Sequence, residues 1–266
     1  MKWQVKMCNS KRGNMGKKLK KTMVIGGAAA AAYGFLPSQL GKLCHRLQKQ
    51  AVRSVEALEG PDKILYLTFD DGPHPVCTAK LLDLLHQYNV KATFFVVGKF
   101  AEENPGLVVR MKEEGHVIGL HSYAHRSAMI QWAGSVKSDM DRCIRVLQDL
   151  GIQAKYYRPP WGHVNWFTLR QLHLRGLEKI LWDVMAEDWK SDTDEEEIQY
   201  KLLKRTQPGD IICLHDRQAD GAPGESDTAL APLQMLAALE KTLPLWLEEG
   251  YRFEVIGGGS IAGSEK

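Results

Sequence analysis

The sequence predicts an α/β protein built on a mainly parallel β-sheet. From Asp62 onward, short runs rich in β-branched and aromatic residues alternate with longer segments of helical periodicity. This alternation is typical of βα units, in which a helix returns the chain so that the next strand runs parallel to the last. Seven strand-like segments with helices between them fit either a (β/α) barrel or an open doubly wound sheet.

Local patterns and breakers place the individual elements. Strands are predicted at residues 64–69, 92–97, 116–120, 154–158, 179–184, 210–214 and 252–256. Helices are predicted at residues 76–88, 105–114, 135–150, 166–175, 194–206 and 229–249. Thr193, with Glu196 three residues later, has the pattern of a capping box. The acidic residues that follow Thr193 are therefore interpreted as a helix start, where negative charge is favourable, and not as a metal site.

The N-terminal part differs in charge from the remainder. Residues 1–53 carry 12 of the 35 Lys and Arg residues and none of the 32 Asp and Glu residues, so residues 54–266 hold 23 basic against 32 acidic side chains. An acidic globular part offers no basic surplus to neutralise phosphates, which excludes a nucleic-acid-binding function for it. We expect four segments: a basic segment with a signal peptide or membrane anchor (1–37), a helical spacer (38–61), a globular domain (62–257) and a C-terminal tail (258–266).

A targeting pattern occupies the basic segment. Lysines at 17–18 and 20–21 precede an uncharged run of 15 residues, 22–36, which Pro37 ends. The run is shorter than the ~20 residues that a spanning helix needs, and small residues offer several cleavage sites. A cleaved signal peptide and a retained anchor both remain open. Either one predicts export, with the globular domain secreted, in the cell wall, or anchored outside the cytoplasm.

The five cysteines are few, widely spaced and odd in number, with no Cys-x-x-Cys pair. This usage predicts neither a zinc finger nor a disulfide framework. Cys143 and Cys213 lie in apolar runs and are interpreted as small core residues.

Polar clusters follow five of the predicted strands, at the ends where both α/β architectures place catalytic groups. Phosphate and dinucleotide motifs are missing from the first strand–helix turn, and no Gly-x-Ser-x-Gly nucleophile elbow occurs. The clusters begin at Asp70-Asp71, His121, Arg158, Asp188-Trp189 and His215-Asp216.

Two of these clusters together predict a metal site. Asp70 and Asp71 repel each other unless a positive group stands between them, although alone they also fit a solvated strand-end turn. His121 and His125 are four residues apart, so from a helical turn both imidazoles would reach one ion. Two histidines and one carboxylate leave open positions for water and substrate, which is the arrangement of a hydrolytic metal centre.

Five motifs in order make the sequence resemble a known family. They are Thr-Phe-Asp-Asp-Gly-Pro at 68–73, His-Ser-x-x-His at 121–125, Arg-Pro-Pro-Trp-Gly at 158–162, Asp-Trp at 188–189 and Leu-His at 214–215. In this order they are similar to the motifs of the polysaccharide deacetylases (NodB-homology domain, carbohydrate esterase family 4), over about residues 62–256. The resemblance implies a distorted (β/α) barrel with about seven parallel strands. It also implies a divalent metal, usually zinc or cobalt, and action on N-acetyl groups of peptidoglycan or chitin-like glycans, or on O-acetyl groups of xylan.

The resemblance assigns roles to the metal and proton-transfer residues. It implies that Asp71, His121 and His125 bind the metal. Asp70 becomes the general base that takes a proton from water, and His215 becomes the acid that protonates the departing sugar nitrogen. Arg158 is expected to pair with the base and Asp188 to orient the acid histidine.

The resemblance also implies a substrate-binding set: Pro73, His74, Trp161, Trp189 and Leu214. A backbone N–H near Pro73 to His74 is expected to hold the oxyanion. Trp161, Trp189 and Leu214 are expected to line the acetyl and sugar pocket.

We therefore predict an exported metal-dependent hydrolase that removes N-acetyl groups from a cell-wall or chitin-like polysaccharide, with peptidoglycan first among the substrates. Zinc is the first choice of cofactor, and cobalt or another divalent ion remains open because imidazole and carboxylate suit several ions. Two alternatives stay open: a non-catalytic carbohydrate-binding wall protein of the same fold, and a hydrolase of small amides. The predicted partner is the glycan and not a nucleic acid, and membrane attachment through the N-terminal segment is left open.

Overall fold

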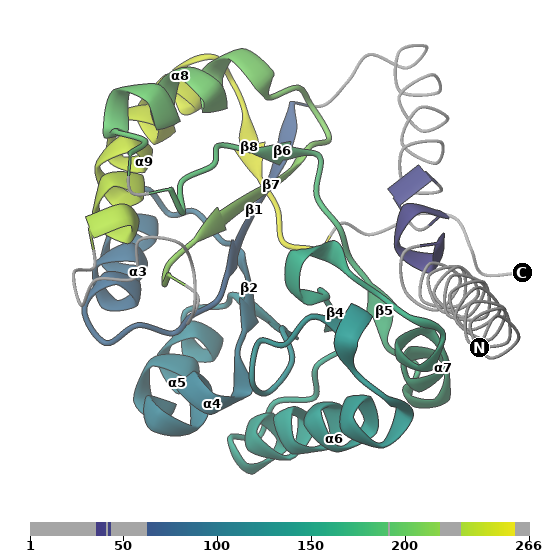
Figure 1. Ribbon diagram of the computed structural model, residues 1–266. Helices are drawn as coiled ribbons and strands as arrows, with labels where there is room; N and C mark the ends of the chain where they lie inside the picture. The colour runs from purple at the N-terminus through teal and green to yellow at the C-terminus, as the bar shows by residue number, and fades with distance from the viewer. Residues whose placement is uncertain (1–35, 41, 44–62, 191, 219–229, 259–266) are drawn as a thin grey trace, which may run out of the picture.

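The computed structural model describes residues 36–40, 42–43, 63–190, 192–218 and 230–258. Its centre is one sheet of parallel strands in the order β5-β4-β3-β2-β1-β7-β6, with β8 paired to the first residues of β1 (Figure 1). The strands are β1 (Ile64–Asp70), β2 (Thr93–Val96), β3 (Val117–Leu120), β4 (Tyr156–Tyr157), β5 (Glu178–Lys179), β6 (Val184–Met185), β7 (Ile211–His215) and β8 (Arg252–Phe253).

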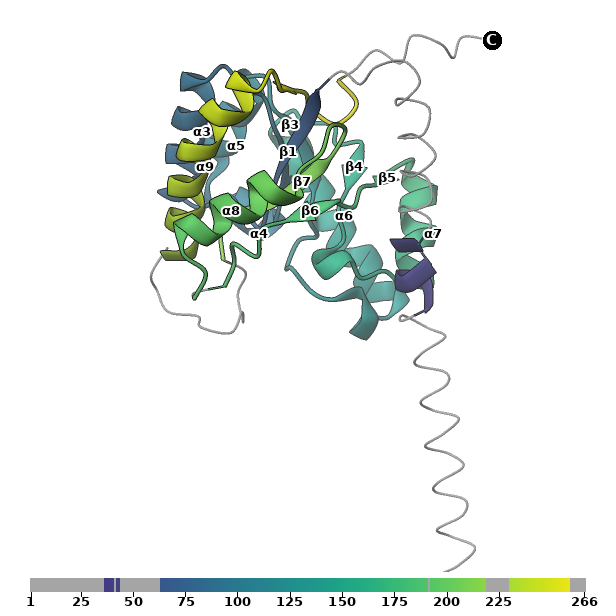
Figure 2. The ribbon, with the colours of Figure 1, turned by 90° about the horizontal axis from the view of Figure 1, so that it is seen from above.

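Helices cover the outer face of the sheet. Neighbours along this layer pack side by side: α8 with α9, α9 with α3, α4 with α6 and α6 with α7 (Figure 2). The helices are α3 (Cys77–Gln87), α4 (Gly98–Glu103), α5 (Pro105–Glu113), α6 (Ala133–Asp149), α7 (Trp166–Arg175), α8 (Glu195–Arg205) and α9 (Leu230–Glu248), with short 3₁₀ turns η2 (Ala128–Ile130) and η3 (Pro160–Gly162).

The sheet curls into a half-barrel. Within the described ranges no ladder joins β5 to β6, so the two edge strands leave the barrel open between them. The predicted single strand at 179–184 is wrong for this reason: its first residue belongs to β5, its last to β6, and the chain between them crosses from one edge to the other. Ile180 N–H still bonds the Tyr157 carbonyl, while Asp183 N–H bonds the Ile211 carbonyl. The remaining predicted strands, and the α/β class, are confirmed.

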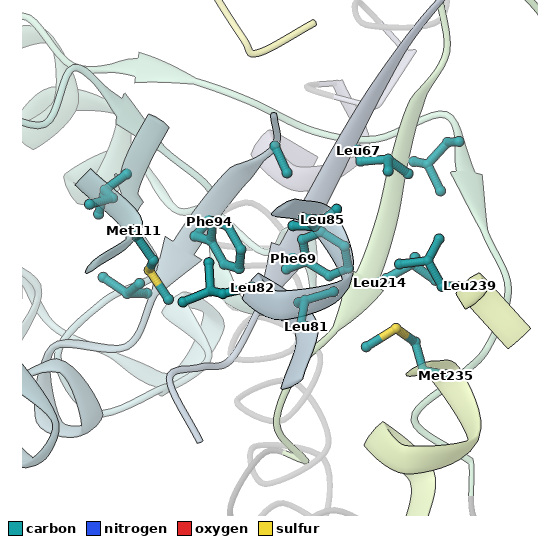
Figure 3. Packing of buried hydrophobic residues seen from close by; sticks show 14 of the residues in the cluster. Leu67, Phe69, Leu81, Leu82, Leu85, Phe94, Met111, Leu214, Met235 and Leu239 are labelled. Atoms are coloured by element: carbon teal, nitrogen blue, oxygen red, sulfur yellow. The ribbon is translucent and has the colours of Figure 1, made fainter. Parts of the chain in front are cut away.

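The hydrophobic core lies between the sheet and its helices. Phe69 of β1 and Phe94 of β2 stack with ring centroids 5.3 Å apart. Leucines of α3 cover both rings, and Figure 3 shows Leu214 of β7 among the side chains of α9. Because strand side chains alternate between faces, the residues between these core positions point to the inside of the half-barrel. The fold thereby supplies a polar interior at the carboxyl ends of its strands.

Helix ends follow their capping residues. Asn165 caps α7 by accepting from the Thr168 N–H, and Gly176 ends the helix in the left-handed conformation. At α8 the expected box is displaced by one residue: Asp194, not Thr193, caps the helix, and its side chain accepts from the Glu197 N–H. The glutamates of the first turn match the positive end of the helix as predicted, and their role is structural.

The segment before the domain is described only at 36–40 and 42–43, where it is helical. Ser38 fastens it to the domain, since its hydroxyl donates to the Val164 carbonyl at 2.9 Å and accepts from the Val164 N–H at 3.0 Å. The rest of the predicted spacer, the boundary at 60–61 and most of the basic segment lie outside the described residues. Among the helices that the structure describes, none combines the length and apolarity that crossing a bilayer requires.

Candidate active site

The two adjacent aspartates stand at the carboxyl end of the central strand. Asp70 is the last residue of β1 and pairs in register with Phe95, just beyond β2's midpoint, and with His215 at the end of β7. Asp71 then turns the chain with a φ of 73°. The carboxylates consequently leave the strand in different directions, and both are buried. Both acids at this strand end lie near Nε2 of His121, Asp70 Oδ2 at 3.9 Å and Asp71 Oδ1 at 3.2 Å.

Asp71 faces two imidazoles. Its Oδ1 lies 3.2 Å from Nε2 of His121 and 3.0 Å from Nε2 of His125. This buried oxygen has no hydrogen-bond partner within the described structure. Burial on its own raises the pKa of Asp71, but the two histidines in their protonated form outweigh burial and hold the pKa well below its usual range.

These three side chains fit a divalent metal. The His121 Nδ1 lies 2.8 Å from the Arg158 carbonyl, so this nitrogen carries the proton and leaves the Nε2 lone pair directed at Asp71. An orphaned carboxylate oxygen beside two imidazole nitrogens is the donor set that zinc and similar ions accept, with positions left for water and substrate. The cluster of Asp71, His121 and His125 is therefore brought together as predicted.

The two histidines do not share a helical turn, contrary to the sequence-based expectation. The loop after β3 is irregular, with positive φ at Ser122 (66°) and His125 (46°). Asp139 of α6 holds it, because its carboxylate accepts from the backbone N–H groups of Tyr123 at 2.7 Å and Ala124 at 3.1 Å. Asp139 was missed from the sequence. Its only signal is an acid placed between the apolar positions of an amphipathic helix.

Asp70 is held by a buried arginine. Arg158, fully buried, donates from Nη1 to Asp70 Oδ1 at 2.7 Å and to Thr68 Oγ1 at 2.6 Å, and from Nη2 to the Leu181 carbonyl at 3.1 Å. Its guanidinium also lies over the Phe95 ring, 4.1 Å from the centroid. The predicted pairing of Arg158 with Asp70 is present.

His215 is held by a buried aspartate. Asp188, in the loop after β6, accepts from the His215 backbone N–H at 2.7 Å and lies 3.0 Å from its Nδ1. Burial on its own lowers the pKa of His215, but the charge and hydrogen bond of Asp188 outweigh it and raise the pKa to about 10. The predicted orientation of His215 by Asp188 is also present. The remaining ring nitrogen, Nε2, is free to face a substrate.

Two tryptophans flank the cluster. The Trp161 ring lies 4.4 Å from the His125 ring and is 49% exposed, and its φ is 54°. The Trp189 ring meets the His215 ring edge-on at 5.4 Å. Strained backbone of this kind persists where surrounding contacts enforce it, often at functional sites. Both tryptophans therefore border the site, as expected for residues that contact a sugar.

Three members of the expected substrate-binding set do not have the roles expected of them. Leu214 is fully buried in the core under α9 (Figure 3), so it does not line the pocket. The His74 N–H donates to Thr78 Oγ1 at 2.7 Å, and Pro73 has no N–H, so neither supplies the expected oxyanion donor. Thr78 in turn donates to the buried carboxylate of Asp216, which lies against Gly72.

Cys213 takes the place that had been expected for Leu214. It precedes His215 by two residues on β7 and therefore shares its face. Cys213 is fully buried, as predicted for a core residue, but its Sγ also lies 3.4 Å from Asp70 Oδ2, a contact that the sequence did not indicate. Cys143 packs in the core as predicted.

Comparison with known proteins agrees with this geometry. The chain matches the family described as polysaccharide deacetylase over residues 57–180. It is 34% identical over 197 residues to a peptidoglycan-N-acetylglucosamine deacetylase of Bacillus cereus, covering 73% of this chain and 87% of the relative.

Solved structures show the same fold. A crystal structure of the Bc1960 peptidoglycan N-acetylglucosamine deacetylase superimposes with a TM-score of 0.67 and 32% identity, covering 77% of this chain and 91% of that one. A family 4 acetyl xylan esterase from Clostridium thermocellum, in complex with a cobalt ion, has a TM-score of 0.63 and 30% identity, covering 73% and 89%. Fold, ordered motifs and sequence identity together place this chain in the polysaccharide deacetylase family, carbohydrate esterase family 4, as an enzyme of that class.

Proposed function

We propose that this enzyme removes N-acetyl groups from a cell-wall polysaccharide, with peptidoglycan as the first candidate, and that it uses a divalent metal, zinc foremost. The observation that carries the proposal is the grouping of a metal-binding trio (Asp71, His121 and His125) with a paired base and a paired acid around one strand end. The names of the relatives support peptidoglycan as substrate.

Each protein side chain has a defined part in the hydrolysis. When bound by the trio, a divalent ion would polarise the acetyl carbonyl and make water more acidic. Asp70, held in place by Arg158, accepts a proton as the water oxygen bonds to the carbonyl carbon. His215 then donates its proton to the sugar nitrogen while the carbon–nitrogen bond breaks, because an amide anion is a very poor leaving group. The products are acetate and a free amino sugar.

The test of the proposal is acetate release by the full-length chain from peptidoglycan and from chitin oligomers. Release is expected to fall to background after the metal is removed with a chelator and to recover when zinc or cobalt is added back. The polymer from which acetate is released faster is identified as the preferred substrate. If metal is shown to be bound and neither polymer yields acetate, the proposal fails, and small amides or non-catalytic glycan binding become the functions to test.

The pH dependence tests the acid. The pKa of His215 in the folded protein is about 10, above the ordinary value of 6.5. The histidine is therefore protonated at pH values below about 10 and loses its proton as the pH rises through about 10. Activity that needs this proton is therefore lost on the alkaline side. Asp188→Asn removes the negative charge, so the alkaline limb of kcat is expected to move to lower pH by more than one unit. If the alkaline limb of the kcat profile does not move in Asp188→Asn, the loss of activity at high pH is due to a group other than His215.

We also propose that the domain works outside the cytoplasm. The support is the sequence of residues 17–37, with its lysines followed by an uncharged run, together with a polymeric wall substrate. Fractionation of cells that produce the full-length chain, with antibodies against the domain, tests this. Recovery of the protein only in the cytoplasmic fraction would contradict it.

A further inference from the structure

A thiol beside the catalytic base is not used by the proposed hydrolysis. We propose that Asp70, Cys213 and His215 form a second cation site, at which excess zinc or another thiophilic divalent ion binds and blocks the enzyme. The site differs from the trio of Asp71, His121 and His125 in its residues and in having sulfur among its donors.

Strand pairing brings the three side chains together. Asp70 ends β1 opposite His215 on β7, and Cys213 stands two residues before His215 on the same face. One ligand atom from each residue lies within 4.8 Å of the others. In a tetrahedral zinc site, ligand atoms are roughly 3.3–3.8 Å apart, as the usual bond lengths of about 2.0–2.3 Å require. Side-chain rotations that move the ligand atoms by about an ångström would bring the three atoms to these separations around an ion.

Existing hydrogen bonds leave the needed lone pairs available. Arg158 occupies Oδ1 of Asp70, so Oδ2 remains, and the thiol already contacts it at 3.4 Å. Asp188 occupies Nδ1 of His215, which leaves Nε2 and supplies the carboxylate–histidine arrangement that orients metal-binding imidazoles. The site is thus supported by partners outside its own three ligands.

The charges around the site set its strength. Binding releases the thiol proton of Cys213, and the proton on His215 as well, and a sulfur–metal bond forms without any oxidant. Burial raises the pKa of Cys213, and Arg158 repels a cation at Asp70, so both oppose binding. We therefore expect the second ion to bind more weakly than the first, and to select zinc, cadmium or cobalt over magnesium, which avoids sulfur.

The ion would inhibit the enzyme because it would occupy lone pairs of the two proposed proton-transfer residues. An ion on Asp70 Oδ2 and His215 Nε2 removes the proton acceptor and the proton donor together. This consequence rests on the proposed function, whereas binding of the ion does not.

Cobalt titration of the full-length, metal-depleted chain tests the site directly. The first equivalent is expected to give a spectrum without sulfur ligation, and further cobalt is expected to add a thiolate-to-cobalt charge-transfer band in the near ultraviolet. Cys213→Ser and Cys213→Ala are expected to keep the first equivalent and lose the band. Cys143→Ala, which removes a core thiol that is not one of the three proposed ligands, is the matched control and should retain it. A band that persists in both Cys213 variants, or is missing from the wild type at saturating cobalt, overturns the site.

Zinc inhibition tests the consequence. Acetate release is measured against rising zinc, each variant relative to its own rate at one equivalent. The zinc concentration that halves the rate is expected to be roughly tenfold higher or more in Cys213→Ser than in the wild type, the scale on which zinc-site partners act. An unchanged value overturns the inhibitory role. A cobalt band that depends on Cys213, in a protein with no acetate release, would keep the second site and reject the proposed function.

Discussion

Replacing Asp70 with asparagine is expected to lower kcat for acetate release by about 10²–10⁴-fold, the usual range for loss of a general base. Asparagine keeps the shape of the side chain and its bond to Arg158, but it does not accept a proton from water. The proposed metal-binding trio contains Asp71 and not Asp70, so the metal content of the variant should stay at one equivalent. Steady-state kinetics and metal analysis on the same preparation check both points.

Asp183→Asn is the matched control for the Asp70 variant. Asp183 is also an aspartate near a strand end, and its carboxylate accepts a hydrogen bond from the Ile211 N–H. We expect this control to change kcat little. If Asp70→Asn retains wild-type kcat with metal bound, another group is the base, and the assignment made from the buried pair is wrong.

Replacing Arg158 with methionine is expected to reduce the free energy of unfolding by about 3–5 kcal/mol, the scale for breaking a buried ion pair from one side. Methionine fills much of the volume over the Phe95 ring. The Asp70 carboxylate, however, is left buried with no cation at 2.7 Å, and Thr68 loses a donor. Denaturant unfolding of the metal-free protein measures the loss.

A double-mutant cycle separates the ion pair from packing. Because asparagine at position 70 carries no charge, the Arg158→Met change should cost less in an Asp70→Asn background than in the wild type. Equal costs in the two backgrounds would show that Arg158 stabilises the fold through its stacking and its bond to the Leu181 carbonyl, and not through Asp70.

The outline of the fold could be predicted because its strands and helices are strongly patterned. The apolar run before Asp70 and the spacing of buried positions in α6 each specify an element from local sequence alone. Helix α4 was missed, since six residues carry too little periodicity to separate a helix from a loop. The split between β5 and β6 depends on pairing with β4 and β7, distant partners that no local pattern contains.

The positions of the proposed catalytic groups were predicted better than the pocket around them. Strand ends converge whatever the loops do, so Asp70, His121 and His215 had to meet. The backbone of the loops is different: the positive φ values at Ser122 and Trp161 are set by tertiary contacts, and the Thr78 bond to the His74 N–H crosses a turn. The error at Leu214 was avoidable. Alternation along β7 places Cys213, and not Leu214, on the same side as His215.

Arg158 serves the site twice, through two chemically unrelated parts of one residue. Its guanidinium holds Asp70, while its backbone carbonyl holds the imidazole of His121. A substitution alters only the first part, since every amino acid brings a carbonyl. Loss of the guanidinium and loss of the carbonyl contact that orients His121 are therefore separable at this one position.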